Sequence, residues 1–177
     1  MIYDASPVSQ LPDLAAVICK RLKTYTRCLY LNSPMMVAGI RCYLTARGLN
    51  VQRAEENGSL VLSSSQAHLV GGLFDVDAMI GSLDAAVNQA LADGYTGLFA
   101  TGDMMWEFGS ERNYGKLREY ETRLEAFFSK TPALSGICQY RRSTLPASAI
   151  QDAFHTHQAV FVNESLSRIN SYYVSAA

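Results

Sequence analysis

T-G-L-F-A-T-G-D-M-M-W, residues 96–106, is the stretch of sequence that decides the fold. Its apolar residues 97–100 predict a buried strand, and the small Gly turn after them delivers Asp103 and then Trp106. In open α/β proteins, ligands bind at the carboxyl edge of the sheet. The stretch therefore predicts an α/β fold with a carboxylate at the edge where a ligand binds.

No phosphate-binding loop accompanies this aspartate, although catalytic aspartates of RecA-like ATPases occupy a comparable position. The pattern G-x-x-x-x-G-K-[ST] does not occur in the sequence. The segment 6–12, which follows the first short strand, contains neither Gly nor Lys to hold phosphates. We therefore expect no ATPase activity.

Strand-like and helix-like patterns alternate along the rest of the chain. Apolar runs predict strands at 27–31, 60–62, 97–100, 134–140 and 159–162, and residues 63–72 are expected to form a polar loop. Helical stripes predict helices over 11–25, between Ser33 and Gly48, between Asp75 and Gly94, over 117–128, and from Pro146 onward. This alternation predicts a three-layer α/β fold: a mainly parallel sheet with helices on both faces.

Composition limits the class of protein. A chain of 177 residues with 49% hydrophobic residues buries one substantial core, so we expect a single domain over residues 1–177. A formal net charge of -1 provides no general attraction for nucleic acid or an anionic membrane. Without a signal peptide or an apolar run of roughly 20 residues, we expect a cytoplasmic protein that does not contact membranes.

The four cysteines and three histidines predict no metal site and no cofactor. The cysteines are scattered without a C-x-x-C pair, which indicates reduced thiols rather than structural zinc ligands. His155 and His157 are expected on a helix, where they diverge by about 200 degrees and would share no ion. His68 is expected at the surface of a polar loop.

Several motifs together resemble the MEDS domain, a sensory module of methanogens and methylotrophs. They are R-C-L-Y-L at 27–31, F-D-V-D-A-M at 74–79, G-Y-T-G-L-F-A-T-G-D-M-M-W at 94–106, R-E-Y-E-T-R-L at 118–124 and C-Q-Y at 138–140. The resemblance implies a degenerate RecA/KaiC-like fold without a working nucleotide site, used to sense small organic molecules or to relay signals. The chain has Asp103 where family members often carry Glu, and its first strand carries no His.

Parallel connectivity would gather polar strand ends and an apolar wall into one crevice at the carboxyl edge, suited to a small, largely apolar organic ligand. The residues expected to bind it are Tyr30, Asp103, Met104, Trp106, Glu121, Gln139, Tyr140 and Arg141. The structural alternative is that Asp103 only caps the following turn and Trp106 only fills the core. Glu121, on an inner helical stripe, would be costly to bury unpaired. It could instead lie just off the buried face and pair with Arg118 or Lys116, or extend a solvated surface with Glu125.

Three functions remain open on this sequence. The leading hypothesis is a non-enzymatic sensory domain that signals through a partner, such as a kinase or a transcription regulator, because no output segment is present. The second is an interaction module without a small ligand, docking on a partner or on itself as a homodimer. The third is a hydrolase in which Asp103 and Glu121 carry out acid/base chemistry.

Overall fold

The computed structural model describes residues 1–3, 6, 8–109, 113–163 and 166–174, and its centre is a five-stranded parallel sheet. The strands lie in the order β1 (Ile2–Tyr3), β7 (Leu134–Arg141), β6 (Gly97–Asp103), β2 (Thr26–Leu31) and β3 (Leu60–Ser63). Every pairing within this sheet is parallel. All carboxyl ends of its strands therefore meet at one edge.

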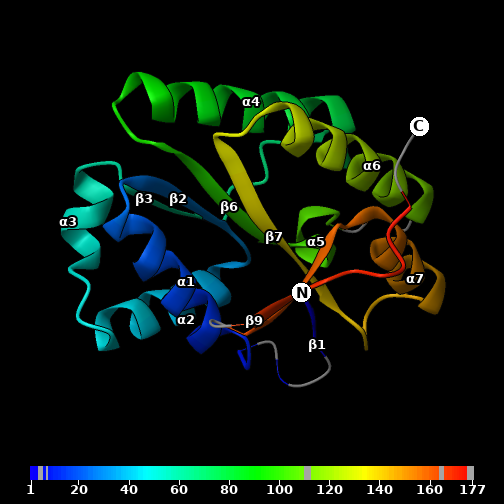
Figure 1. Ribbon diagram of the computed structural model, residues 1–177, viewed down its shortest axis with the longest axis horizontal. Coiled ribbons are helices and arrows are strands. Elements are labelled where there is room, and N and C mark those ends of the chain that lie inside the picture. The colour runs from blue at the N-terminus through cyan, green and yellow to red at the C-terminus, as the bar shows by residue number, and fades with distance from the viewer. Residues whose placement is uncertain (4–5, 7, 110–112, 164–165, 175–177) are drawn as a thin grey trace.

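Helices cover both faces of the sheet (Figure 1). One face carries α1 (Leu11–Lys23), α2 (Pro34–Ala46) and α3 (Val51–Glu56), and the other carries α4 (Val76–Ala92), α6 (Tyr114–Lys130) and α7 (Ala147–Thr156). The short helix α5 (Met104–Glu107) follows β6 directly. The prediction of a three-layer α/β fold is confirmed.

No helix among the described residues combines the length and apolar character needed to cross a membrane.

Strand β6 shows why the sequence folds this way. Six of its seven residues are buried, because it lies between β7 and β2 with helices above and below. Phe99 packs into the core under α1 and α2, whereas Leu98 packs against α4 on the opposite face. A strand buried on both faces is apolar throughout rather than alternating, as the 97–100 run is.

The structure differs from the local predictions at three places: a predicted strand is present but lies outside the main sheet, a predicted loop contains a short strand, and one helix was not predicted. The predicted strand at 159–162 is β8 (Ala159–Asn163), which pairs antiparallel with β9 (Leu166–Ile169) in a hairpin separate from the main sheet. The predicted loop 63–72 contains β4 (Leu69–Val70), which pairs with β5 (Leu73–Phe74). Helix α3 was not predicted, because six residues with two buried positions give no recognisable stripe.

Strand β7 is only partly covered at its outer side. Within the described residues, β1 pairs with Tyr140 and Arg141 alone. Met1 extends this contact, since its carbonyl accepts a hydrogen bond of 2.8 Å from the N–H of Tyr140. The first half of β7, from Leu134 to Ile137, therefore forms the edge of the sheet on this side.

Candidate functional site

Asp103 ends β6 and begins α5, as the capping alternative predicted. Its carboxylate accepts hydrogen bonds from the backbone N–H of Trp106 at 3.0 Å and from the hydroxyl of Tyr3 at 2.7 Å. Burial and the adjacent Asp103 carboxylate both raise the pKa of Tyr3, so the hydroxyl remains a donor. The predicted carboxylate is thus at the carboxyl edge, with two protein donors.

Polar groups beside Asp103 also bind one another. Gln139 is fully buried; its amide donates to Thr101 at 2.9 Å and its carbonyl accepts from Gln10 at 3.5 Å. The hydroxyl of Tyr30 accepts a hydrogen bond of 3.2 Å from Asn32. Beside these residues, the Nε of Arg141 and the side-chain oxygen of Gln10 are buried without a hydrogen-bond partner in the described part of the chain.

The strand registers separate the eight predicted residues into two sets. Tyr30, Asp103, Gln139 and Arg141 occupy positions on the sheet face that α1 covers. Met104, Glu121 and Tyr140 pack on the opposite face with α6, and Trp106 lies edge-to-face with the ring of His68 at 6.3 Å. The structure therefore places Asp103 and Glu121, the pair named for hydrolysis, against opposite faces of the sheet.

Glu107 is a buried acid that the sequence analysis missed. Only 2% of this residue is exposed, and its Oε2 has no hydrogen-bond partner among the described residues. It fits because position 102 is Gly: a Cβ there would lie 1.9 Å from Oε1 of Glu107. Burial, and secondarily the Glu121 and Asp103 carboxylates, raise the pKa of Glu107 well above its ordinary value.

His68 is also buried, contrary to the expected surface position. It is 5% exposed, and its Nε2 lies within hydrogen-bond distance, 2.8 Å, of the Glu107 carbonyl oxygen. Burial lowers the pKa of His68. The imidazole therefore anchors the 63–72 segment, with its hairpin strand β4, to α5.

A second buried group joins α6 to the segment after α7. Glu121 is 2% exposed, and its Oε2 lies 3.2 Å from Nε2 of His157, without the alignment of a hydrogen bond. The same Nε2 is 2.8 Å from the hydroxyl of Tyr140. Burial alone would lower the pKa of His157, but Glu121, with smaller contributions from Cys138 and Glu125, holds it well above its ordinary value.

Cys138 completes this group, which we call the Glu-Cys-His cluster: Glu121, Cys138 and His157. One ligand atom of each side chain lies within 4.8 Å of those of the other two. Burial and the Glu121 carboxylate raise the pKa of the Cys138 thiol to about 11. Glutamate, cysteine and histidine side chains are common metal ligands, so the cluster has the composition of a metal site.

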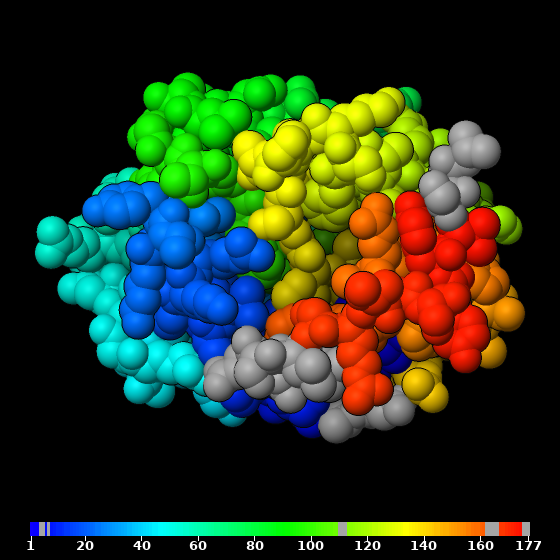
Figure 2. All heavy atoms as spheres, in the orientation of Figure 1, coloured from blue at the N-terminus to red at the C-terminus, as the bar shows by residue number. Residues whose placement is uncertain are grey.

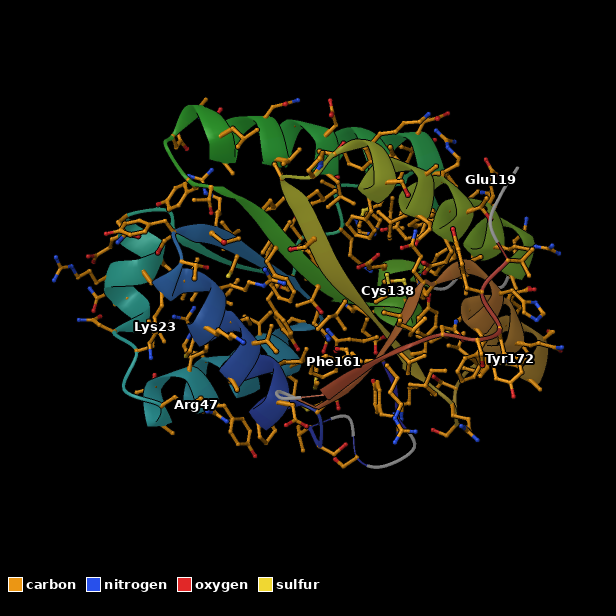
Figure 3. All side chains as sticks on the ribbon, in the orientation of Figure 1. Lys23, Arg47, Glu119, Cys138, Phe161 and Tyr172 are labelled. Carbon is orange, nitrogen blue, oxygen red and sulfur yellow. The ribbon has the colours of Figure 1, made fainter. Side chains whose placement is uncertain are left out.

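A cleft of about 670 Å³ opens beside the cluster, along the uncovered edge of β7. We call it the β7 cleft. Figure 2 shows β7 at its base, between α1 and α6, with the β8–β9 hairpin on the near side. Cys138 and Phe161, labelled in Figure 3, lie on the strand and on the hairpin respectively. The apolar part of its lining includes Val17, Phe99, Phe128, Ile137 and Phe161.

Charged and titratable groups also line the β7 cleft. Lys20 and Arg21 reach it from α1, Glu125 from α6, and His157 from the end of α7. The guanidinium of Arg21 lies 5.5 Å from the centre of the Phe99 ring, a cation–π distance. None of the eight residues predicted for ligand binding lines this cleft, which lies beside β7 and not at the carboxyl edge.

Comparison with models of protein families identifies a family for this chain. The family model described as "MEDS: MEthanogen/methylotroph, DcmR Sensory domain" matches residues 4–158, which is most of the chain. The matched segment contains α6, β7 and α7 and ends one residue after His157, before the β8–β9 hairpin. No curated protein matches the chain.

Proposed function

The chain belongs to the MEDS family of sensory domains, and from this premise we propose that it senses a small, largely apolar organic molecule bound in the β7 cleft. The single observation that carries the proposal is the cleft itself, which is lined by apolar side chains together with polar and charged ones. Pockets for small molecules are mostly apolar concave sites of roughly 300–1,000 Å³ with a few polar groups that orient the ligand. The β7 cleft is within this range.

The lining indicates how a ligand would be held. Phe99, Ile137 and Phe161 offer apolar contact from two strands and the hairpin. Lys20 and Arg21 on α1 offer donors, suited to a carbonyl, hydroxyl or halogen substituent on an otherwise apolar body. A ligand of this kind would bury its hydrocarbon surface while its polar end stays hydrogen-bonded.

The same lining suggests the route of the signal. Phe161 and Ser167 belong to the two strands of the β8–β9 hairpin, which lies outside the main sheet and has Ile169 94% exposed. A ligand that bridges β7 and Phe161 would favour one position of this hairpin. We infer that the hairpin transmits occupancy to a signalling partner, such as a kinase or a transcription regulator, and that the chain itself is not an enzyme.

The test is a ligand screen by thermal unfolding, followed by calorimetric titration of any compound that raises the melting temperature. A ligand at about a hundred times its dissociation constant stabilises a protein by roughly 2.7 kcal/mol. We expect Phe161→Ala, which shortens the cleft wall, and Ser129→Trp, which fills it from α6, to weaken binding at least tenfold. Tyr172→Ala, an aromatic truncation outside the cleft, is the matched control and should bind as the wild type does.

The carboxyl edge is the second candidate, favoured by the buried Nε of Arg141, which has no hydrogen-bond partner among the described residues. In the same titration, Trp106→Ala and Asp103→Asn should leave affinity unchanged if the ligand occupies the β7 cleft. Loss of binding in these variants, with normal binding in Phe161→Ala, would place the ligand at the carboxyl edge instead. A screen without any shift, together with capture of a protein partner, would favour the interaction module.

A further inference from the structure

We propose that the Glu-Cys-His cluster is a metal site, in which Glu121, Cys138 and His157 bind one zinc-class divalent transition ion on the wall of the β7 cleft. The inference does not depend on an organic ligand, since the cluster is defined by its own geometry. It departs from the sequence-based expectation of no metal, because the three ligands come from α6, β7 and the residue after α7, at no diagnostic spacing.

The three side chains already lie close to the arrangement that a shared metal ion requires. Their ligand atoms lie within 4.8 Å of one another, and one pair, Oε2 of Glu121 and Nε2 of His157, is 3.2 Å apart. With metal–ligand bonds of about 2.0–2.3 Å, tetrahedral ligands are separated by about 3.3–3.8 Å. Sub-ångström to ångström shifts of side chains would therefore bring all three onto one ion.

An independent observation points to a missing partner for Glu121. The residue is 2% exposed, yet both oxygens of its carboxylate are buried without a hydrogen-bond partner in the described part of the chain. A buried carboxylate without such bonds is costly. The ion pair with His157 relieves only part of this cost, whereas a divalent ion bound to a carboxylate and a thiolate would have a neutral first coordination shell.

The surroundings of His157 complete the arrangement. If Nε2 binds the ion, the other ring nitrogen, Nδ1, lies 3.7 Å from Oε2 of Glu125, one turn after Glu121 on α6. A carboxylate beside the second nitrogen of a ligating histidine is the usual way that proteins orient such rings. The Tyr140 hydroxyl, 2.8 Å from Nε2, would turn its hydrogen bond to Glu121 or to a bound water.

The side facing the cleft leaves room for a fourth ligand. Cys138 and His157 both line the β7 cleft, so a water or a ligand atom has access to the ion from there. Binding releases two protons to solvent: the thiol proton of Cys138 as the sulfur–metal bond forms, and the Nε2 proton of the His157 imidazolium as the nitrogen–metal bond forms. A soft thiolate with imidazole and carboxylate selects zinc-class ions over Mg²⁺ or Ca²⁺, which prefer oxygen ligands.

The experiment uses Co²⁺ as the probe, because a cobalt–thiolate bond gives a near-ultraviolet charge-transfer band that no other ligand type here produces. The whole chain, stripped of metal with a chelator and kept reduced, is titrated with Co²⁺ alone. We expect the band to saturate at one Co²⁺ per chain and to be abolished by Zn²⁺, which binds such sites more tightly. Absence of the band in the wild-type protein at excess Co²⁺ would overturn the proposal.

Variants identify the ligands. Cys138→Ser should abolish the band, whereas Cys42→Ser, at the exposed thiol on α2, should retain it. His157→Gln removes a proposed ligand and should weaken Co²⁺ binding. His155→Gln changes the histidine two residues earlier and is the matched control, which should bind Co²⁺ as the wild type does. Glu125→Gln should weaken Co²⁺ binding by about 10- to 100-fold while keeping the band.

Two readouts keep the outcome distinct from folding and from the organic ligand. Circular dichroism of each variant without metal reports whether the chain folds, and a band that persists in folded Cys138→Ser protein refutes the site. Binding of the organic compound is measured separately with Phe161→Ala, a variant outside the cluster. Failure of either measurement leaves the result of the other intact.

Discussion

Replacing Glu107 with Gln should stabilise the protein as the pH rises. The Glu107 carboxyl is buried at the end of α5, and burial raises its pKa well above the ordinary 4.5. Above that ordinary value, the unfolded chain releases the proton while the folded chain retains it. Unfolding then releases a proton, so the free energy of unfolding falls with rising pH until the folded-state pKa is reached. Gln has nearly the same shape and carries no proton to lose.

The magnitude follows from proton linkage. One proton released on unfolding changes the free energy of unfolding by about 1.4 kcal/mol per pH unit. From about pH 5 to about pH 7, Glu107→Gln should therefore gain up to about 2.7 kcal/mol over the wild type, as long as the folded-state pKa is not exceeded. At this chain length such a gain corresponds to a rise in melting temperature of roughly 5–11 °C.

Urea unfolding in the presence of a chelator, at a series of pH values, provides the assay. The wild-type protein and the variant differ only at position 107, so the difference between their stability curves reports on the Glu107 carboxyl. Glu119→Gln on α6, where the side chain is 56% exposed, is the matched control and should show no pH-dependent gain. Parallel stability curves for Glu107→Gln and the wild type would refute the assignment of a protonated Glu107.

The remaining predictions concern the contacts that hold the sheet edges and α4. Tyr3→Phe removes the 2.7 Å bond to the Asp103 carboxylate and should cost about 1.5–3 kcal/mol in urea unfolding, because the acceptor is charged. Gly136→Ala would place a Cβ 2.6 Å from the backbone oxygen of Ala100, so we expect a loss of about 1–3 kcal/mol through strain between β6 and β7. Asp75→Ala removes the cap of α4 and should cost about 1 kcal/mol, measured in the same way.

The parts of the fold that the sequence predicts are those in which local pattern and burial agree. The run 97–100 is apolar throughout because β6 is buried on both faces. Residues 27–31 in β2 alternate between buried and half-buried positions, and their apolar side chains were enough to predict the strand. The stripe within 117–128 marks the buried face of α6. The hairpin β8–β9 has the apolar residues of a strand at 159–162, but only tertiary pairing decides that it stays outside the sheet.

The site was less predictable, because its residues come together only through the packing of separate elements. Glu121 stood out as an acid on an inner stripe, and Cys138 as a thiol in a strand. His157 was assigned to a helix, whereas α7 ends at Thr156, so the imidazole leaves the helix and turns back to Glu121. One signal was available: Gly136, Cys138 and Tyr140 alternate in β7, which directs all three toward the face that α6 covers.

The two proposals meet in the segment that follows α7. His157 belongs to the Glu-Cys-His cluster, and four residues later Phe161 lines the β7 cleft from the hairpin. An ion bound by His157 would hold the start of this segment against α6 and β7. The β8–β9 hairpin could then move only relative to this fixed start. A ligand held against Phe161 would then act on the hairpin alone. On this reasoning the metal provides rigidity, the organic ligand provides the signal, and metal removal should weaken ligand binding without shifting it to another site.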